Sequence, residues 1–423
     1  MKSILIQILG ILARLTIRRY RPIVIGVTGS VGKTSAKEAI FAVLRTRYRT
    51  RRSQKSYNTE IGMPLAILGA EHQQGNVFGW LGVLLRSAWH LVLPAVYPEV
   101  LILEYGVQQP GDMDYLVGIA PPLVAVVTAI GEVPVHVEYF AGPLAVAEEK
   151  GKLAAALPAA GYAVLNSDDD TVSDMRGRTA AHPMTYGFGS DAMLCIHGYA
   201  LDEHGLRCSF THGTDTASVH LRNTFGKQQA YAAAAAVAVG LVLNLRFSDA
   251  ARAVEAYEAP PGRLKLLGGN KGSRILDDTY NAAPAAMHAA LDVLSEFPAA
   301  RRRIAVLGDM LELGRFTEAA HRAVGDQVSR TADIFIAVGE RMKFAAEEVR
   351  ARWGRESSVR MFWFATSPEA GKKLEALLQP GDTVLVKGSQ DMRMERVVEE
   401  IMAEPQRAKE LLVRQDTEWL TRL

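Results

Sequence analysis

Cysteine, net charge and long apolar stretches are all scarce in this sequence, and each shortage excludes a class of protein. The 423 residues include only two cysteines, Cys195 and Cys208. A disulfide framework or a zinc site needs more ligands than these, so we expect two buried free thiols. The 48 basic residues almost balance the 46 acidic ones, which leaves no basic footprint of the kind that nucleic-acid binding requires.

The first apolar stretch, residues 3–18, is too short to cross a bilayer and has Arg14 within it. Arg18, Arg19 and Arg21 follow where a signal peptide would be cleaved. Polar residues and glycine recur in this stretch every three or four residues, which predicts an amphipathic helix. The least apolar stripe of this helix holds Ser3, Gln7, Gly10, Arg14 and Arg18. Two interpretations stay open: the helix anchors the protein at an anionic membrane surface, or it packs its apolar face on the protein body.

A second apolar stretch, residues 77–93, also predicts a helix. Trp80 and Trp89 are of the type that settles at a bilayer interface, although core packing explains them equally well. The residues on its one less apolar face are Gly79, Gly82, Arg86 and His90. The two helices either bury each other, or residues 1–21 and 77–93 together form a patch for peripheral membrane contact.

Residues 23–35, IVIGVTGSVGKTS, predict a buried strand that runs through a glycine-rich turn into a helix. Glycines in such a turn let backbone N–H groups face a phosphate, and the helix N-terminus adds its positive dipole end. The lysine would reach the β- and γ-phosphates, and the threonine hydroxyl would hold Mg²⁺. Although Val27 stands where a P-loop usually has glycine, we predict an ATP site formed by Gly29, Ser30, Gly32, Lys33, Thr34 and Ser35.

The alternation of strands and helices beyond this loop predicts an α/β protein with two lobes. The length exceeds what one hydrophobic core usually supports, and APPG at residues 259–262 interrupts the rhythm. Residues 193–222 predict a small antiparallel meander, and the tail after Glu404 is expected to be a charged, solvated helix. We expect an amphipathic helix (1–22), a central P-loop ATPase domain with a mostly parallel sheet (23–259) and a Rossmann-like C-terminal domain (260–423).

Candidate ligands follow the predicted strands of the central domain. Glu104 ends the strand VLILE, and another strand ends near Gly131. Because ligands in open α/β sheets gather at the carboxyl ends of strands, both places are expected to face the phosphate loop. His136 comes soon after, and Lys150 lies on the helix that follows.

A series of motifs over residues 23–401 resembles the Mur ligase family, and within it the MurF branch, which adds D-alanyl-D-alanine to a UDP-muramoyl tripeptide. The motifs are GVTGSVGKTS, NTEIGMPLAIL, LEYGVQQPGDMDYL, AIGEVPVHVEYF, EEKGKL, LNSDDD, PPGRL, DDTYNAAP, LGDMLELG and LVKGS. The resemblance implies that ATP phosphorylates a carboxylate and that an amine then attacks the acyl phosphate, forming an amide. The implied substrates are a peptide or muropeptide carboxylate and an amino acid or dipeptide amine.

By resemblance, Lys33, His136 and Lys150 are the expected catalytic residues. Thr34 and Glu104 would ligate one Mg²⁺ ion and His136 a second. Lys150 matches a lysine that is carbamylated in this family, which turns a cation into a metal ligand; the alternative is a plain surface lysine. The resemblance assigns Arg263 and Asp278 to the nucleotide, and Asn281, Lys387, Gly388 and Ser389 to the substrates.

Several positions depart from the family pattern. A histidine–asparagine pair and a further asparagine usually open the helix near residue 228, so different contacts to the nucleotide base are expected. Lost donors near the incoming substrate favour a different amine. The departing residues are Gln228, Gln229, Ala232, Ala283 and Gln390.

Only 22 residues precede the phosphate-loop strand, where MurF-type ligases have a domain that grips the UDP-sugar. We expect that domain to be absent and hypothesise a carboxylate substrate presented at the membrane, such as a lipid-linked muropeptide, or by another protein. Location is then cytoplasmic, peripherally at the inner face of the membrane. Two alternatives are an amidating subunit that takes ammonia from a glutaminase partner and a non-catalytic ATP-binding paralogue.

Overall fold

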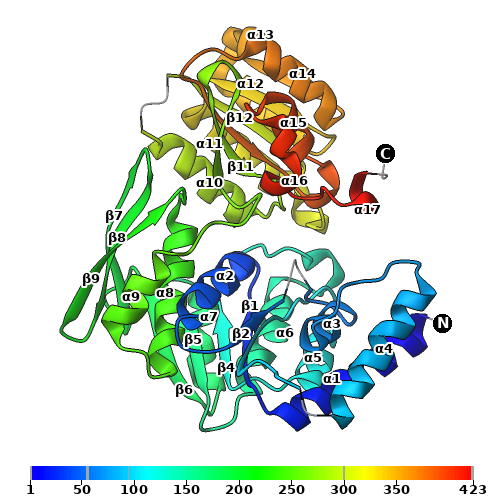
Figure 1. Ribbon diagram of the computed structural model, residues 1–423. Helices are drawn as coiled ribbons and strands as arrows, with labels where there is room; N and C mark the ends of the chain where they lie inside the picture. Colours follow the sequence, from blue (N-terminus) through cyan, green and yellow to red (C-terminus); the bar gives the residue numbers. More distant parts are fainter. Residues whose placement is uncertain (1, 54–56, 94, 299–300, 421–423) are drawn as a thin grey trace.

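The computed structural model describes residues 2–53, 57–93, 95–298 and 301–420, which form two α/β lobes stacked on each other (Figure 1). Residue 1 and residues 421–423, the outer ends of the predicted domain ranges, lie outside the described residues. Each lobe contains one sheet covered by helices. The expected fold class, a P-loop lobe with a mostly parallel sheet plus a Rossmann-like lobe, is confirmed.

The first sheet has nine strands among the described residues, in the order β2-β3-β1-β4-β5-β6-β7-β8-β9. Its parallel strands are β1 (Ile23–Thr28), β2 (Thr50–Arg52), β3 (Val100–Glu104), β4 (Val124–Val127), β5 (Tyr162–Asn166) and β6 (His182–Gly187). The predicted antiparallel meander is present as β7 (Leu194–Asp202), β8 (Gly205–His212) and β9 (Asp215–Arg222). Every residue of β3 is buried, as expected for a strand with helices on both faces.

Helices cover both faces of this sheet. Successive side chains of β1 point to opposite faces, and on each face they pack against a different set of helices. Ile25 belongs to a buried cluster with α2 (Lys33–Leu44), α8 (Lys227–Val242) and α9 (Phe247–Val254). Its neighbour Val24 belongs to the cluster on the other face, with α5 (Asp112–Ile119) and α6 (Pro143–Ala155). Cys195 and Cys208 carry free thiols, as predicted, but only Cys208 is buried and Cys195 is half-buried.

The second sheet has the order β10-β11-β15-β12-β13-β14 in the described part of the chain. Its strands are β10 (Lys265–Gly268), β11 (Arg274–Asp278), β12 (Arg303–Gly308), β13 (Ile334–Val338), β14 (Met361–Phe364) and β15 (Thr383–Lys387). The β10 strand is antiparallel to β11, and the other pairs are parallel. The sheet therefore consists of five parallel strands with the antiparallel β10 at one edge.

Helices flank the second sheet on both faces and short turns join the elements. One face is covered by α10 (Pro284–Glu296), α11 (Thr317–Thr331) and α12 (Met342–Trp353), and the other by α14 (Ser367–Leu377) and α15 (Glu395–Ile401). In the first lobe the short turns are η1 (Val137–Tyr139), α7 (Asp170–Ser173) and η2 (Asp174–Arg178). In the second lobe they include η3 (Asn270–Gly272), η4 (Gly314–Phe316), η5 (Gly354–Glu356), α13 (Ser357–Arg360) and η6 (Gln390–Met392).

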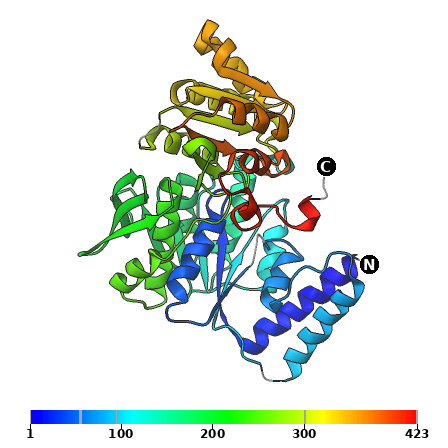
Figure 2. The same ribbon diagram turned by 45° about the horizontal axis from the view of Figure 1, so that its top comes forward.

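The two apolar helices lie side by side at the N-terminal corner of the first lobe (Figures 1 and 2). They are α1 (Lys2–Tyr20) and α4 (Val77–Val92). Leu9, Ala13 and Thr16 are buried on α1, which packs on α3 (Gly62–Leu68), α5 and α4. One edge of the apolar face therefore packs on the body, and the other remains exposed. Among the described residues, no helix is both long and apolar enough to cross a bilayer.

The expectation of a charged, solvated helix after Glu404 is wrong. The tail breaks into η7 (Pro405–Arg407), α16 (Ala408–Leu411) and α17 (Thr417–Leu420). Leu412 has extended backbone and Arg414 a positive φ of 58°, so no single helix runs through the tail. Both of these side chains are buried against the second lobe, a role that the charged composition of the tail does not indicate.

Asp169, just before α7, ties down the loop that follows β4. Its carboxylate accepts the N–H groups of Ile130 at 2.8 Å, Gly131 at 2.9 Å and Val172 at 3.1 Å. Because Asp169→Ala leaves all three donors without this acceptor, we expect the free energy of unfolding to fall by about 1–3 kcal/mol. Thermal unfolding measures the change, and the exposed Asp170→Ala is the control. Equal effects of the two variants would contradict this role for Asp169.

Candidate active site

A cavity of 340 Å³ lies between the two lobes, and a second cavity of 210 Å³ adjoins it. Lys33, Asn58, Gln108 and His136 line both cavities. The predicted residues that line the first are Ser30, Gly32, Lys33, Thr34, Ser35, Glu104, His136, Arg263, Asp278, Asn281 and Lys387. Gly29, Lys150, Gly388 and Ser389 are the predicted residues that do not line it.

The phosphate loop takes its shape from its glycines. Gly29 has φ +140°, and a Cβ there would lie 2.0 Å from the Thr128 hydroxyl, so a side chain does not fit. The N–H groups of Ser30 and Val31 donate to the Ala129 carbonyl at 2.7 and 3.1 Å. The amides left to face a phosphate are thus those of the first turn of α2, which have no acceptor within the helix. Within the described residues the buried Ser30 hydroxyl has no hydrogen-bond partner, which fits a site for a polar ligand.

Lys33 stands at the start of α2 and folds back on the loop. Its Nζ donates to the Gly29 carbonyl at 2.7 Å. Burial lowers the pKa of Lys33 to about 8; the Glu104 carboxylate opposes this shift, and the Arg263 cation adds to it. The negative charge near Lys33 is therefore too small to offset the effect of burial on its ammonium group. A bound phosphate would supply the missing negative charge.

Thr34 and Glu104 form an oxygen-rich pair beside Lys33. The Thr34 hydroxyl donates to Glu104 Oε2 at 3.5 Å, and both residues are buried. Lys37 Nζ lies 3.0 Å from Glu104 Oε1 and donates to the Ser53 carbonyl at 2.9 Å. A hydroxyl and a carboxylate are ligands that Mg²⁺ prefers, usually with phosphate oxygens and water completing the shell. Among the described residues no three His, Cys, Asp or Glu side chains gather into a metal site, so the fit is of this open kind.

Sequence reasoning missed Lys37, although it lies one helical turn after Lys33 in the string KTSAK. Its exposed fraction is 1%. The spacing alone places both lysines on one face of a helix, which was the available signal.

His136 connects the lobes. It has a positive φ of 66°, and its Nδ1 lies 2.6 Å from Oε2 of Glu312, in the loop after β12. The hydrogen bond from His136 lowers the pKa of the Glu312 carboxyl group, against the effect of burial. Sequence reasoning missed Glu312, which belongs to the motif LGDMLELG.

Lys150 and Lys152 of α6 differ in their surroundings. The Lys152 side chain is 41% exposed and pairs with Asp114 at 2.6 Å and Glu149 at 2.7 Å. Lys150 is 1% exposed. Burial lowers its pKa well below the ordinary value, the Lys33 cation adds to the effect, and Glu149 and Asp112 oppose it. The alternative of a plain surface lysine is therefore wrong for Lys150.

The second lobe places an ion pair on the opposite wall of the cavity. Lys387 Nζ donates to Asp278 Oδ2 at 2.6 Å and to the Asn281 carbonyl at 2.9 Å. Burial opposes both charges: it raises the pKa of Asp278 and lowers that of Lys387. Ser389 lies deeper, where its hydroxyl accepts the Leu311 N–H at 2.9 Å. Its contact supports a neighbouring loop and does not reach the cavity.

Arg263 crosses the gap between the lobes. Its guanidinium lies 3.9 Å from the centre of the Tyr280 ring, and its Nη2 donates to the Thr34 hydroxyl at 3.3 Å. Gln229, one of the departures from the family pattern, holds the same linker. Its Nε2 donates to the Arg263 carbonyl at 2.9 Å, and its Oε1 accepts the Tyr257 hydroxyl at 2.6 Å.

The other departures have different positions. Gln228, Ala283 and Gln390 line the cavity between the lobes. Ala232 is buried in the core of the first lobe. The side chain at position 232 therefore packs in that core, whereas the first three positions face the ligand space.

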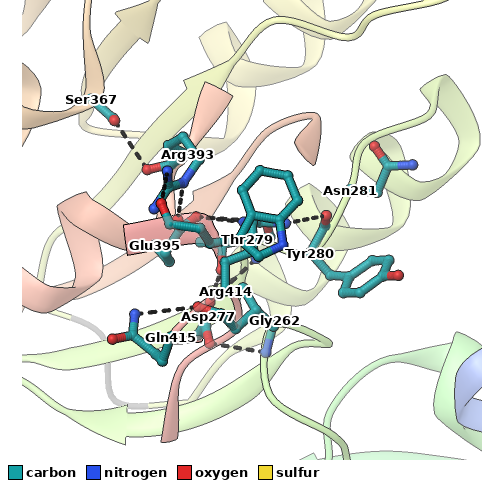
Figure 3. A network of polar contacts seen from close by, with 12 residues as sticks. Gly262, Asp277, Thr279, Tyr280, Asn281, Ser367, Arg393, Glu395, Arg414 and Gln415 are labelled. Atoms are coloured by element: carbon teal, nitrogen blue, oxygen red, sulfur yellow. Dashed lines mark hydrogen bonds and ion pairs between the residues drawn. The ribbon is translucent and has the colours of Figure 1, made fainter. Parts of the chain in front are cut away.

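A buried network fixes the turn that carries Tyr280 and Asn281 (Figure 3). Arg414, from the tail, donates to Glu395 Oε2 at 2.8 Å, to the Tyr280 carbonyl at 3.0 Å and to the Thr279 carbonyl. Asp277 accepts the Thr279 hydroxyl at 2.6 Å and the Gly262 N–H at 3.0 Å. The tail, the linker and the end of β11 are thus held together behind the wall of the cavity that Asp278, Tyr280 and Asn281 form.

Comparisons with known proteins agree with this arrangement. The model of the Mur ligase middle domain matches residues 90–240, and that of the Mur ligase glutamate ligase domain matches residues 262–390. The UDP-N-acetylmuramoyl-tripeptide–D-alanyl-D-alanine ligase of Mycobacterium bovis is 30% identical over 402 residues, covering 90% of this chain and 73% of the relative. The chain belongs to the Mur ligase family. The ligase of the same name from Bacillus subtilis is 28% identical over 388 residues, covering 90% of this chain and 76% of the relative.

Solved Mur ligase structures have the same fold. The MurF ligase from Thermotoga maritima in complex with ADP gives a TM-score of 0.77 at 25% identity, covering 93% of this chain and 83% of that chain. Folylpolyglutamate synthase from Mycobacterium tuberculosis, complexed with ADP and AMPPCP, shares the fold alone, with a TM-score of 0.63 at 17% identity over 90% of this chain and 93% of that chain. This Mur ligase is an ATP-dependent, peptide-bond-forming enzyme, and ATP with Mg²⁺ fits the loop and the Thr34–Glu104 pair.

We expect Arg414 to act as a positioning residue for nucleotide binding. Arg414→Met removes the donors to the carbonyls of Thr279 and Tyr280, so the turn loosens and ADP affinity should fall by about tenfold. Glu395→Gln also breaks the buried ion pair but leaves those donors, so it should lower the thermal midpoint with a smaller change in ADP affinity. Calorimetric titration with ADP measures the difference, with the exposed Arg407→Met as control. If Arg414→Met and Glu395→Gln lost equal affinity for ADP, Arg414 would only stabilise the fold and would not position the turn for nucleotide binding.

Proposed function

We propose that this ligase joins a peptide-like carboxylate, such as that of a muropeptide, to the amine of an amino acid or dipeptide. Relatives named for UDP-N-acetylmuramoyl-tripeptide and D-alanyl-D-alanine support these substrate classes. The observation that carries the proposal is one cavity with Lys33, Thr34 and Glu104 on one wall and Arg263, Asp278 and Lys387 on the other.

The proposed chemistry has two steps. A carboxylate oxygen attacks the γ-phosphorus of ATP, the bond to the β-phosphate oxygen breaks, and ADP leaves. The amine nitrogen then attacks the acyl carbon, the bond to the phosphate oxygen breaks, and the nitrogen gives up a proton as phosphate leaves. Phosphoryl transfer depends mainly on positioning and charge neutralisation, which are what this set of residues provides.

Each wall has its own task in this proposal. Lys33 exchanges the Gly29 carbonyl for phosphate oxygens. Arg263 brings a positive charge from the linker to the same phosphates, and Asp278 shares its carboxylate between Lys387 and a ribose hydroxyl. Asn281 lines the substrate side around the incoming amine, whereas Gly388 and Ser389 support that side from outside the cavity, Ser389 through the loop of Leu311.

Two Mg²⁺ ions would bind in this site, one held by Thr34 and Glu104 and one by His136 and a carbamylated Lys150. Bound Mg²⁺ would neutralise the charge that gathers on the phosphates. In carbamylation the neutral amine of Lys150 bonds to the carbon of CO₂ and loses a proton. The burial of Lys150 and the nearby Lys33 cation both disfavour an ammonium group there, which supports the modification.

We also propose that the enzyme acts in the cytoplasm, peripherally at the inner face of a membrane, through residues 1–21 and 77–93. The support is α4, whose single buried residue among those described is Ser87. An apolar helix that buries so little of itself needs a partner outside the protein body.

Substitution of Lys150 separates carbamylation from a purely structural role. We expect Lys150→Ala to lower turnover at least about a hundredfold, because charge stabilisation in the cavity is lost, and formate to restore part of it. Lys152→Ala is the matched control on α6. Carbon-13 NMR with labelled bicarbonate should show a carbamate signal in the wild type and in Lys152→Ala. Its persistence in Lys150→Ala, or its absence in the wild type, would refute the modification at this residue.

Phosphate release from ATP and Mg²⁺ in the presence of candidate amines tests the reaction. With UDP-N-acetylmuramoyl-tripeptide or a lipid-linked form of it as acceptor, we expect release that depends on an amino acid or dipeptide. Lys33→Ala should abolish both release and nucleotide binding, whereas Lys372→Ala on the exposed surface of α14 should not. Release that depends on ammonia would instead identify an amidating subunit, and no release with any amine would identify a non-catalytic paralogue.

A further inference from the structure

The outward face of α1 is apolar. Side chains recur on it at intervals of three or four residues, so they form one stripe along the helix. The stripe consists of Ile4, Ile8, Ile11 and Leu15, each 37–61% exposed. Packing on the protein body uses the other edge of the helix and leaves this stripe in water.

A second stripe runs along α4, which packs on α1. It consists of Phe78, Leu81, Leu85, Trp89 and Val92, each 51–86% exposed. Together the two stripes form what we call the α1–α4 surface. Single exposed apolar residues are ordinary, but two adjacent apolar stripes mark an interaction site.

The charges on these helices indicate the kind of partner. Neither Lys2–Tyr20 nor Val77–Val92 contains an aspartate or a glutamate, whereas Arg18, Arg19 and Arg86 are exposed on these helices. A two-fold dimer through this surface would bring the same cations of both copies together. An anionic bilayer would instead accept the apolar stripes between its headgroups and neutralise the arginines. The exposed Trp89 is a residue type enriched at that interface.

The smaller cavity of the active site lies next to this surface. It runs from Lys33 and His136 to Tyr115 and Leu116 on α5, the helix on which α1 packs. A Cβ at Gly10 of α1 would lie only 3.2 Å from the Tyr115 hydroxyl. The acceptor side of the cavity therefore ends against the same helix that carries the exposed stripe.

We propose that the α1–α4 surface docks on an anionic bilayer and that the carboxylate acceptor is anchored to a lipid in that bilayer. This inference rests on the proposed ligase function and names its acceptor class. A lipid-anchored acceptor is confined to the layer beside α1, so docking brings its peptide to the cavity bounded by Tyr115.

Vesicle flotation tests the docking. We expect the full chain to float with vesicles of phosphatidylglycerol and phosphatidylcholine, and to float less with phosphatidylcholine alone or in high salt. The triple variant Phe78→Ser, Leu85→Ser, Trp89→Ser should lower vesicle affinity at least about tenfold. Val359→Ser, which alters a 70% exposed side chain on α13 of the other lobe, is the control. A wild type that stays at the bottom, or a dimer in ultracentrifugation that the triple variant abolishes, would overturn docking on lipid.

Turnover of two acceptors tests the anchored substrate. N-acetylmuramoyl-tripeptide on a polyprenyl diphosphate in these vesicles is compared with soluble UDP-N-acetylmuramoyl-tripeptide, with D-alanyl-D-alanine as the amine. We expect faster phosphate release with the anchored acceptor, and the triple variant should lose that advantage while keeping its rate on the soluble one. Equal rates on both acceptors in the wild type would overturn the inference and leave the ligase function standing. No release with either would overturn the ligase function and the acceptor class together.

Discussion

Buried positive charge is the constraint on which this active site depends. Lys37, Lys150 and Lys387 are each at most 2% exposed, and Lys33, Arg263 and Lys387 line the cavity between the lobes. Glu104 forms an ion pair with Lys37 at 3.0 Å, and Asp278 forms one with Lys387 at 2.6 Å. Removing an unpaired cation from water is unfavourable by several kcal/mol, so the site is complete only when anions enter it or when a lysine gives up its charge. A bound triphosphate would do the first, and the proposed carbamylation of Lys150 would do the second.

Local sequence signals predicted most of the fold and one side of the site. The apolar strand and glycine turn of residues 23–35 predicted the phosphate loop, and the strand-end rule placed Glu104 beside it. Neither signal predicts which partner a side chain takes from a distant part of the chain. Lys37 on Glu104, Glu312 on His136 and Arg414 on the turn after β11 all result from tertiary packing. The prediction for the tail was wrong for a related reason. Its charged composition is typical of a solvated helix, but Arg414 of the tail is buried in an ion pair with the buried Glu395.

The departures from the family pattern have separable physical roles. Gln229 makes two hydrogen bonds, one of which ties α8 to the linker of Arg263, and it also lines the cavity, so this position stabilises the hinge at the edge of the ligand space. Gln228, Ala283 and Gln390 face the cavity, where loss of a donor changes what a ligand finds there. A polar group of a ligand that is left without a partner there would be unfavourable.

The N-terminal helix α1 is buried on one side and exposed on the other. A helix that is apolar on nearly all sides is stable only between two apolar surroundings. Leu9 and Ala13 of α1 face the protein core, and Ile4 and Ile11 face outward. Burial on one side fixes the helix in place, so the outward stripe cannot turn inward without breaking the contact with α5. The protein therefore presents this stripe on the helix that packs beside the smaller cavity, and a lipid surface that covered it would also limit where an acceptor peptide approaches Lys33 and His136.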